Sequence, residues 1–238
     1  MAAARADIPL PYRIIALMQE QNRLFAYPLN RLAIEIWSTK FQCSHCGTCC
    51  TRAVNRHIFL LDHDVDHIKK IDPDAYVPAP EPEFCDQNGI LYVSGYALRM
   101  KNDTTESCWF LENNRCSIYD NRFSGCRIYP HMLRRSPDAT GTVSWQRFAH
   151  RDEHGETGPG RSLEECLALA QEIKEYENAY LLQQISFLET IHDYFTVHHL
   201  QHDPVMHKER MKQIQREEPV DIKVFHEGEL EDYRIVKP

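Results

Sequence analysis

The stretch Phe41-Gln42-Cys43-Ser44-His45-Cys46-Gly47-Thr48-Cys49-Cys50 holds four of the nine cysteines of this 238-residue chain. The first three recur at every third residue, so a bent loop can turn three thiolates toward one centre, and Gly47 allows the backbone to bend. We expect the adjacent Cys50 to point elsewhere and to ligate a second centre, because neighbouring side chains rarely serve one tetrahedral ion. Four cysteines at this spacing predict metal ligands rather than small buried apolar side chains.

Three cysteines further along the chain could close the ligand shell that this loop opens. Cys108 and Cys116 begin two facing strand-like runs, and Cys126 follows Ser124-Gly125. The two isolated cysteines, Cys85 and Cys166, are interpreted as small buried apolar side chains. An odd cysteine count without an N-terminal apolar run disfavours a secreted disulfide framework, so we expect a reducing, cytoplasmic compartment.

The two cysteine blocks together resemble a known family. CxxCGxCC at Cys43–Cys50, followed by CWFLENNRCSIYDNRFSGCRIYP at Cys108–Pro130, is similar to the YkgJ-like CxxCxxCC cysteine-cluster family, a zinc- or iron-chelating domain. The resemblance covers about residues 41–165 and departs from the family pattern at two positions. Phe123 stands where the family has proline, and His154 stands where it has its last cysteine. The resemblance therefore implies His154 as a candidate ligand, the alternative being a solvated loop histidine.

The number of candidate ligands favours iron over zinc. A zinc site takes four ligands, and the predicted set is larger than one such site: Cys43, Cys46, Cys49, Cys50, Cys108, Cys116, Cys126 and His154. We therefore favour an iron–sulfur cluster, in its simplest form [4Fe-4S], in one or two copies, with zinc as the alternative. A flagellin lysine methylase of the same family carries such a cluster, which supports the preference by resemblance.

Three side chains flank the predicted ligands and are candidates for contact with the cofactor. Arg127 could neutralise thiolate charge, and the hydroxyls of Tyr119 and Tyr129 could donate to sulfur. Ordinary packing is the alternative for the two tyrosines.

The remaining sequence indicates an α+β protein in four consecutive segments. We expect an N-terminal helical segment at 1–40, a cysteine-cluster metal-binding domain at 41–161, a long helix at 162–203 and a charged tail at 204–238. The domain should be a small core of short strands and helices around the metal. Ser162 and Glu165 form a capping box for the long helix, whose apolar residues recur every three to four positions, so one face should pack on the core or on a partner.

Shorter elements are predicted within the second segment. Asp62 should cap a helix that ends near Lys69 and Lys70. Turn residues between strand-like runs predict three hairpins, which join 90–93 to 96–100, 108–111 to 116–119, and 132–134 to 143–145.

Charge and hydropathy restrict the partners. With 27 Lys and Arg against 35 Asp and Glu, the net charge is −8, which disfavours binding to a nucleic-acid backbone. The apolar run Ile14–Met18 is too short to span a membrane. We expect a redox, oxygen-sensing or regulatory accessory protein whose long helix docks a protein partner. The rivals are a cluster-dependent S-adenosylmethionine methyltransferase, for which the sequence offers no substrate domain, and a zinc-stabilised structural module.

Overall fold

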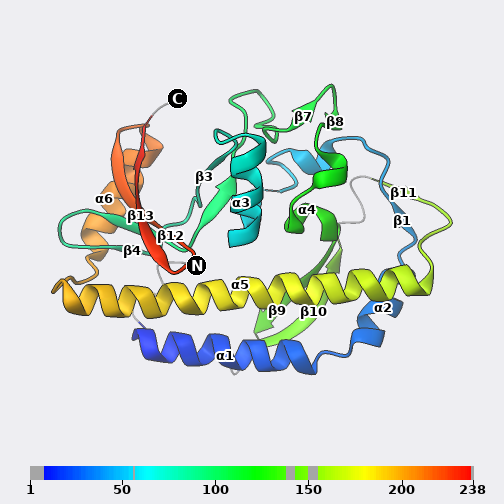
Figure 1. The fold of residues 1–238 in the computed structure, drawn as a ribbon, viewed down its shortest axis with the longest axis horizontal. Helices are drawn as coiled ribbons and strands as arrows, with labels where there is room; N and C mark the ends of the chain where they lie inside the picture. Colours follow the sequence, from blue (N-terminus) through cyan, green and yellow to red (C-terminus); the bar gives the residue numbers. More distant parts are fainter. Residues whose placement is uncertain (1–7, 56, 138–142, 150–154, 237–238) are drawn as a thin grey trace. The chain divides into compact units, whose positions relative to one another are not determined.

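The computed structural model describes residues 8–55, 57–137, 143–149 and 155–236. It combines helices with small, mostly antiparallel sheets, which confirms the predicted α+β class (Figure 1). The chain divides into two compact units that each take several segments of the sequence. Unit 1 comprises Met1–Leu17, Phe59–Ala97 and Leu182–Pro238, and unit 2 comprises Met18–Ile58 and Leu98–Leu181. The division differs from the four consecutive segments expected, because the chain leaves unit 2 after Ile58 and returns to it at Leu98.

Two helices contribute residues to both units. Helix α1 spans Leu10–Ala26, and the long helix α5 spans Leu163–Val197. The predicted capping box begins α5, since the N–H of Glu165 donates to Oγ of Ser162 and the N–H of Ser162 donates to the Glu165 carboxylate. The apolar stripe of α5 is buried within the chain; its buried residues include Leu169, Ala170, Ile173, Leu181, Phe187, Leu188 and Ile191. A protein partner for this helix stays a prediction.

Unit 2 contains short elements around the two cysteine blocks and one longer hairpin. Its elements besides the two shared helices are α2 (Leu29–Trp37), β1 (Phe41–Gln42), the 3-10 helix η1 (Thr48–Cys50), β7 (Leu111–Glu112), β8 (Arg115–Cys116), the 3-10 helix η2 (Tyr119–Asn121), α4 (Ser124–Ile128), β9 (His131–Pro137), β10 (Val143–Ala149) and β11 (Glu156–Thr157). The predicted hairpin at 132–134 and 143–145 is confirmed as β9–β10, with Arg134 opposite Gln146.

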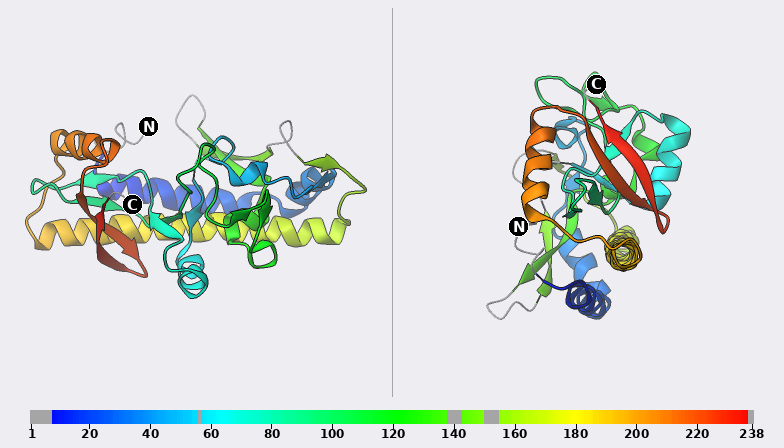
Figure 2. Two further views of the ribbon diagram at one scale, coloured as in Figure 1. Left: turned by 90° about the horizontal axis from the view of Figure 1, so that it is seen from above. Right: turned by 90° about the vertical axis from the view of Figure 1, so that its left-hand side faces the viewer.

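The second half of α1 lies beside the first half of α5 in unit 2 (Figures 1 and 2). Nζ of Lys174 donates to the backbone carbonyls of Phe25 and Tyr27, which close the end of α1. Nε1 of Trp145 donates to the carbonyl of Glu20, so β10 is fastened to the same helix. These contacts give unit 2 a helical base with Ile173, Leu24 and Leu32 in its core, and the cysteine blocks form the rest of the unit.

Unit 1 contains two sheets with helices. Its elements are β2 (Phe59–Leu60), α3 (Asp62–Ile71), β3 (Tyr76–Pro78), β4 (Phe84–Cys85), β5 (Leu91–Val93), β6 (Tyr96–Leu98, whose last residue belongs to unit 2), α6 (Pro204–Gln215), β12 (Val220–His226) and β13 (Glu229–Ile235). The strand orders are β13-β12-β5-β4 and β2-β6-β3. Figure 2 shows α6 beside the twisted β12–β13 hairpin. The segment at 204–238, expected as a charged tail, is thus largely folded.

The structure corrects one predicted hairpin. Strands β5 and β6 form where expected, but they do not pair with each other. Strand β5 pairs in parallel with β12 and β6 pairs with β2, so the chain crosses from one sheet to the other at Ser94-Gly95. Gly95 is needed there because a Cβ would lie 2.7 Å from the Gln183 side chain and 2.9 Å from the Phe59 ring.

The predicted helix near Asp62 is confirmed as α3, although Leu61 rather than Asp62 precedes its first turn. Asp62 and Asp64 lie in the first turn and Lys69 and Lys70 in the last, which suits the helix dipole. None of the helices in the described ranges combines the length and apolar composition that a membrane span requires.

Candidate metal centre

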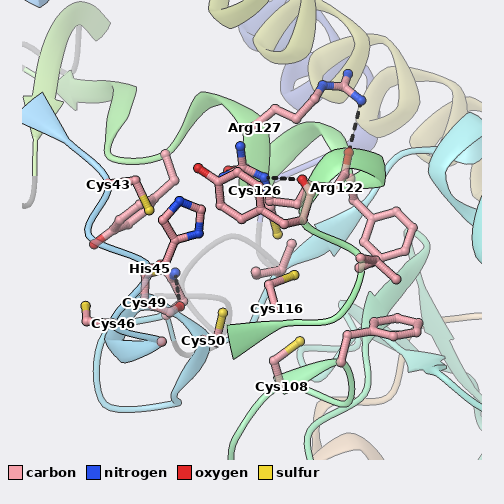
Figure 3. Close-up of a pocket in the computed structure, with 18 of the residues that line it drawn as sticks. Cys43, His45, Cys46, Cys49, Cys50, Cys108, Cys116, Arg122, Cys126 and Arg127 are labelled. Atoms are coloured by element: carbon pink, nitrogen blue, oxygen red, sulfur yellow. Dashed lines mark hydrogen bonds between the residues drawn. The ribbon is translucent and has the colours of Figure 1, made fainter. Parts of the chain in front are cut away.

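One pocket in unit 2 brings the two cysteine blocks together (Figure 3). The seven cysteines predicted as ligands all line it: Cys43, Cys46, Cys49, Cys50, Cys108, Cys116 and Cys126. Cys46 is exposed at the edge of the group, whereas Cys108 is buried and the other five are partly buried. Cys50 lines the same pocket as the other six, and its role as a ligand to a second centre stays a prediction.

The first block is shaped by a left-handed glycine and a 3-10 turn. Gly47 has φ +74, and its carbonyl accepts the N–H of Cys50 at 2.9 Å to begin η1. Any Cβ at Gly47 would lie 2.9 Å from the carbonyl oxygen of Asn114, so the loop packs directly against the turn between β7 and β8. Nδ2 of Asn55 donates to the carbonyl of Cys49 at 2.7 Å and fixes the far end of the loop. The sequence thus sets the loop as a rigid bend rather than a flexible linker.

The second block begins with the predicted hairpin, which is confirmed as β7–β8 with Leu111 opposite Cys116. Asn113 and Asn114 have φ +48 and +60, as a two-residue type I′ turn requires, and asparagine tolerates this region well. Cys116 is held in the ladder, while Cys108 precedes β7 and donates its N–H to the carbonyl of Cys50. The hairpin therefore places two thiols against the loop of the first block.

Cys126 comes from the short helix α4, which begins after Phe123. Phe123 has φ −65, the angle to which a proline ring would lock this position, so its backbone keeps the conformation that the family's proline imposes. The ring is 2 % exposed and packs against Phe110, with the centroids 6.0 Å apart. The N–H groups of Cys126 and Arg127 both donate to the carbonyl of Phe123, which turns Cys126 into the pocket. Phe123 therefore gives the start of α4 a backbone angle that a proline at this position would also have.

The thiols influence one another electrostatically. A hydrogen bond from the Cys50 thiol lowers the pKa of Cys49 to about 7, and the same bond raises the pKa of Cys50 well above its ordinary value. Burial raises the pKa of Cys108 to about 11 and also raises the pKa values of Cys116 and Cys126. These three thiols are therefore neutral near pH 7 unless a cation stabilises their thiolates, as a bound metal does.

Arg122 is a cation that acts on three of the thiols, and the sequence interpretation missed it. Its charge lowers the pKa values of Cys49, Cys116 and Cys126, against larger opposing effects of burial on all three. The guanidinium lies 3.8 Å from the centre of the Tyr119 ring, and its Nε donates to the carbonyl of Tyr119. Its position four residues before Cys126 on the approach to α4 was the available signal.

One of the three predicted flanking residues, Arg127, takes another role in part. Arg127 lines the pocket, but its Nε donates to Glu172 on α5 and another guanidinium nitrogen donates to the carbonyl of Arg122 (Figure 3). The hydroxyl of Tyr119 hydrogen-bonds with the Cys43 thiol, which adds to burial in raising the tyrosine pKa. Tyr129 also lines the pocket.

His45 is the histidine that the described part of the chain places in this pocket. Its ring lies against Tyr119, with the centroids 4.2 Å apart, and it is held between Cys43 and Cys46 on a backbone with φ +56 (Figure 3). Its position between two cysteines of the motif could have suggested a ligand. His154, the predicted ligand, lies outside the described residues.

The two cysteines interpreted as ordinary apolar side chains do not line the pocket. Cys85 is fully buried in β4, and burial raises its pKa to about 12. Cys166 is buried on α5, where burial likewise raises its pKa.

The spacing of the sulfurs bears on the kind of metal that fits. With Zn–S bonds of about 2.3 Å, a tetrahedral zinc site holds its sulfurs about 3.8 Å apart. In the part of the chain that the structure describes, no three cysteine sulfurs lie within 4.8 Å of one another. The donor set is all thiol apart from His45, which suits zinc or iron by its softness, and seven thiols are more than one tetrahedral ion takes.

Comparison with known proteins agrees with this donor set. The searches of curated proteins and of solved structures found no match to the chain. Residues 42–154 match the model of the CxxCxxCC family, described as "Putative zinc- or iron-chelating domain", and this range includes both cysteine blocks. The chain therefore contains, at residues 42–154, a region similar to the CxxCxxCC family, whose model is that of a zinc- or iron-chelating domain.

Proposed function

We propose that this protein binds an iron–sulfur cluster, in its simplest form [4Fe-4S], through thiolates of the pocket in unit 2. The observation that carries the proposal is the gathering of seven cysteines in one pocket, which is more thiols than one tetrahedral zinc site takes. Both blocks would contribute ligands, with Cys49 or Cys50 from the loop and Cys108, Cys116 and Cys126 from the second block. Bound iron would supply one-electron redox chemistry at this place.

The surroundings of these thiols support a cluster with a tunable potential. Arg122 adds positive charge beside three of the sulfurs, and the hydroxyl of Tyr119 bonds to a fourth, Cys43. Charge and hydrogen bonds to sulfur are the means by which proteins set cluster potentials. The exposed Cys46 marks an edge that oxygen and small oxidants can reach. We therefore propose a redox or oxygen-sensing role rather than a purely structural one.

Anaerobic purification of the full chain tests the cluster. We expect a brown protein with iron and acid-labile sulfide in near-equal amounts and with visible charge-transfer absorption. Stoichiometric zinc without iron would contradict the proposal and support the zinc-stabilised module instead. If the cluster is present, exposure to air should bleach the visible absorption within hours, and an absorption unchanged by air and by reductant would exclude both redox roles.

A further inference from the structure

The turn between β12 and β13 in unit 1 gathers three side chains of metal-ligand type, none of them in the cysteine pocket. One ligand atom each from Asp66, His226 and Glu227 lies within 4.8 Å of the other two. Asp66 is on α3, His226 ends β12 and Glu227 begins the turn after it, so the group joins a helix to the hairpin turn beside it (Figure 2). All three belong to unit 1, whereas the cysteine pocket belongs to unit 2.

The local backbone explains why these residues meet. Glu227 and Gly228 form the two-residue turn that pairs His226 with Glu229, and both have positive φ, +48 and +87. A type I′ turn of this kind favours asparagine, aspartate or glycine at the position of Glu227, so glutamate is an unfavourable choice for the turn itself. On α3, Asp62 and Asp66 are four residues apart and share the face toward the turn, where the backbone N–H of Glu227 bonds to the Asp62 carboxylate.

His226 supplies the observation that points to a ligand. Its side chain is only 4 % exposed, and its Nδ1 lies 3.1 Å from Oε1 of Glu231. The other carboxylate oxygen of Glu231 accepts the hydroxyl hydrogen of Tyr96 at 2.5 Å, so the carboxylate is itself fixed. Among the described residues, Nε2 of His226 is buried without a hydrogen-bond partner. Histidine ligands of metal ions often bond to a carboxylate through one ring nitrogen and coordinate the metal through the other, and the bond to Glu231 leaves Nε2 of His226 free to do so.

The surrounding charge also favours a cation. The carboxylates of Asp62, Asp66, Glu227 and Glu231 gather around the one imidazole of His226. Oδ1 of Asp62 is a second buried polar atom without a partner among the described residues. Besides His226, Lys69, three residues beyond Asp66 on α3, also acts on the charge of Glu231. The group therefore combines an excess of negative charge with an imidazole nitrogen that lacks a partner.

We propose that Asp66, His226 and Glu227 bind a divalent first-row transition-metal ion, such as Mn²⁺, Fe²⁺ or Zn²⁺. One imidazole nitrogen and two carboxylate oxygens suit these ions, whereas Mg²⁺ and Ca²⁺ prefer oxygen ligands alone. Three protein ligands leave positions for water or for a small anionic ligand. The proposal is independent of the cluster proposed for unit 2.

The test uses the full chain with its cysteine pocket as isolated, and Mn²⁺ alone as the probe. Thiolates bind Mn²⁺ poorly, so Mn²⁺ separates this group from the cysteine pocket. Free Mn²⁺ is measured by electron paramagnetic resonance in titrations of the wild type, of Asp66→Asn and of Glu227→Asn. Asparagine suits the turn at Glu227, so that variant removes the carboxylate without harming the fold. Glu229→Gln, which removes an exposed carboxylate from the same hairpin, is the matched control.

We expect one bound Mn²⁺ per chain in the wild type and in Glu229→Gln, and an affinity about 10- to 100-fold weaker in the other two variants. Zn²⁺ should displace the bound Mn²⁺ at far lower concentration than Mg²⁺ does, because the imidazole is a ligand. Equal Mn²⁺ binding by the wild type and by Asp66→Asn and Glu227→Asn would overturn the site, as would a wild type that binds none. Displacement by Mg²⁺ as effective as by Zn²⁺ would overturn the role of His226.

Discussion

The N–H of Cys108 donates to the carbonyl oxygen of Cys50 at 2.7 Å, and this bond joins the two cysteine blocks through their backbones. Bridges between Thr51 and Ser107 and between Met100 and Cys108 continue the pairing on either side. The positions of the thiols therefore rest on main-chain hydrogen bonds as well as on any metal they hold. Replacing a single thiol should remove metal without removing the framework around it.

The exchange Cys108→Ser, compared with Cys85→Ser, tests this separation. Both cysteines are buried, at 5 % and 0 % exposure, so each serine carries a similar cost of about 1–3 kcal/mol for a buried hydroxyl. Only Cys108 lines the pocket. We expect the iron or zinc content per chain to fall by half or more in Cys108→Ser and to stay at the wild-type value in Cys85→Ser. Equal metal contents in the two variants, measured by elemental analysis, would show that the pocket is not the metal centre.

Arg122 and Arg127 offer a second matched pair. Arg122→Gln removes the positive charge that acts on Cys49, Cys116 and Cys126, whereas Arg127 is already engaged by Glu172. We expect Arg122→Gln to weaken metal binding about tenfold or more and Arg127→Gln to change it little, with Arg122→Lys restoring part of the loss. If the centre is an iron–sulfur cluster, its midpoint potential should fall in Arg122→Gln, because the reduced state carries more negative charge. A larger effect from Arg127→Gln would reverse this assignment.

Alanine substitutions at Gly47 and Gly228 distinguish the cost of backbone strain from the cost of steric contact. Both have positive φ, but a Cβ at Gly47 meets Asn114 and Leu111, whereas a Cβ at Gly228 meets nothing within 4 Å. We expect Gly228→Ala to lower the free energy of unfolding by about 1–2 kcal/mol, the cost of a left-handed alanine. Gly47→Ala should cost more, because the loop must also move away from the β7–β8 turn, and it should reduce the metal content. Denaturant unfolding measures the free energy of unfolding of both variants. Equal losses of stability in the two would rule out a close contact of a Cβ at Gly47 with the β7–β8 turn.

The parts of the structure that could be predicted from the sequence are those fixed by neighbours along the chain. The capping box of Ser162 and Glu165 and the β7–β8 turn at Asn113 and Asn114 involve residues at most three positions apart, and both are confirmed. The gathering of the two cysteine blocks could be anticipated because cysteines at metal-ligand spacing share metals. Such local and chemical signals do not depend on the rest of the fold.

The parts that could not be predicted depend on distant pairing. Ser94-Gly95 looks like a hairpin turn, yet Leu91 pairs with Ile222, a residue in a segment whose charge suggested a tail. The group of Asp66, His226 and Glu227 has no motif spacing because its members come from two remote segments. The sequence predicted Arg127 rather than Arg122 as the cation near the thiols, because spacing alone does not say which guanidinium turns toward sulfur.

A buried carboxyl on α5 predicts how stability depends on pH. Glu177 is 6 % exposed, and burial raises its pKa to about 7 although Arg135 acts in the opposite direction. Between its ordinary value near 4.5 and pH 7, the folded protein keeps this proton while the unfolded chain loses it. The contribution of Glu177 to the free energy of unfolding is thus fully present below about pH 4.5 and is lost as the pH rises through 7. The loss is at most about 3 kcal/mol, at 1.36 kcal/mol for each pKa unit.

The exchange Glu177→Gln should remove this dependence, because the amide stays uncharged at every pH. We expect the variant to match the wild type near pH 5 and to exceed it in free energy of unfolding by about 1–3 kcal/mol at pH 8. Glu175→Gln, at an exposed position two residues away on the same helix, should keep the wild-type pH profile. Urea unfolding at intervals between pH 5 and pH 8 measures all three proteins. A Glu177→Gln profile parallel to that of the wild type would mean that Glu177 is ionised in the folded protein throughout this range, held so by Arg135.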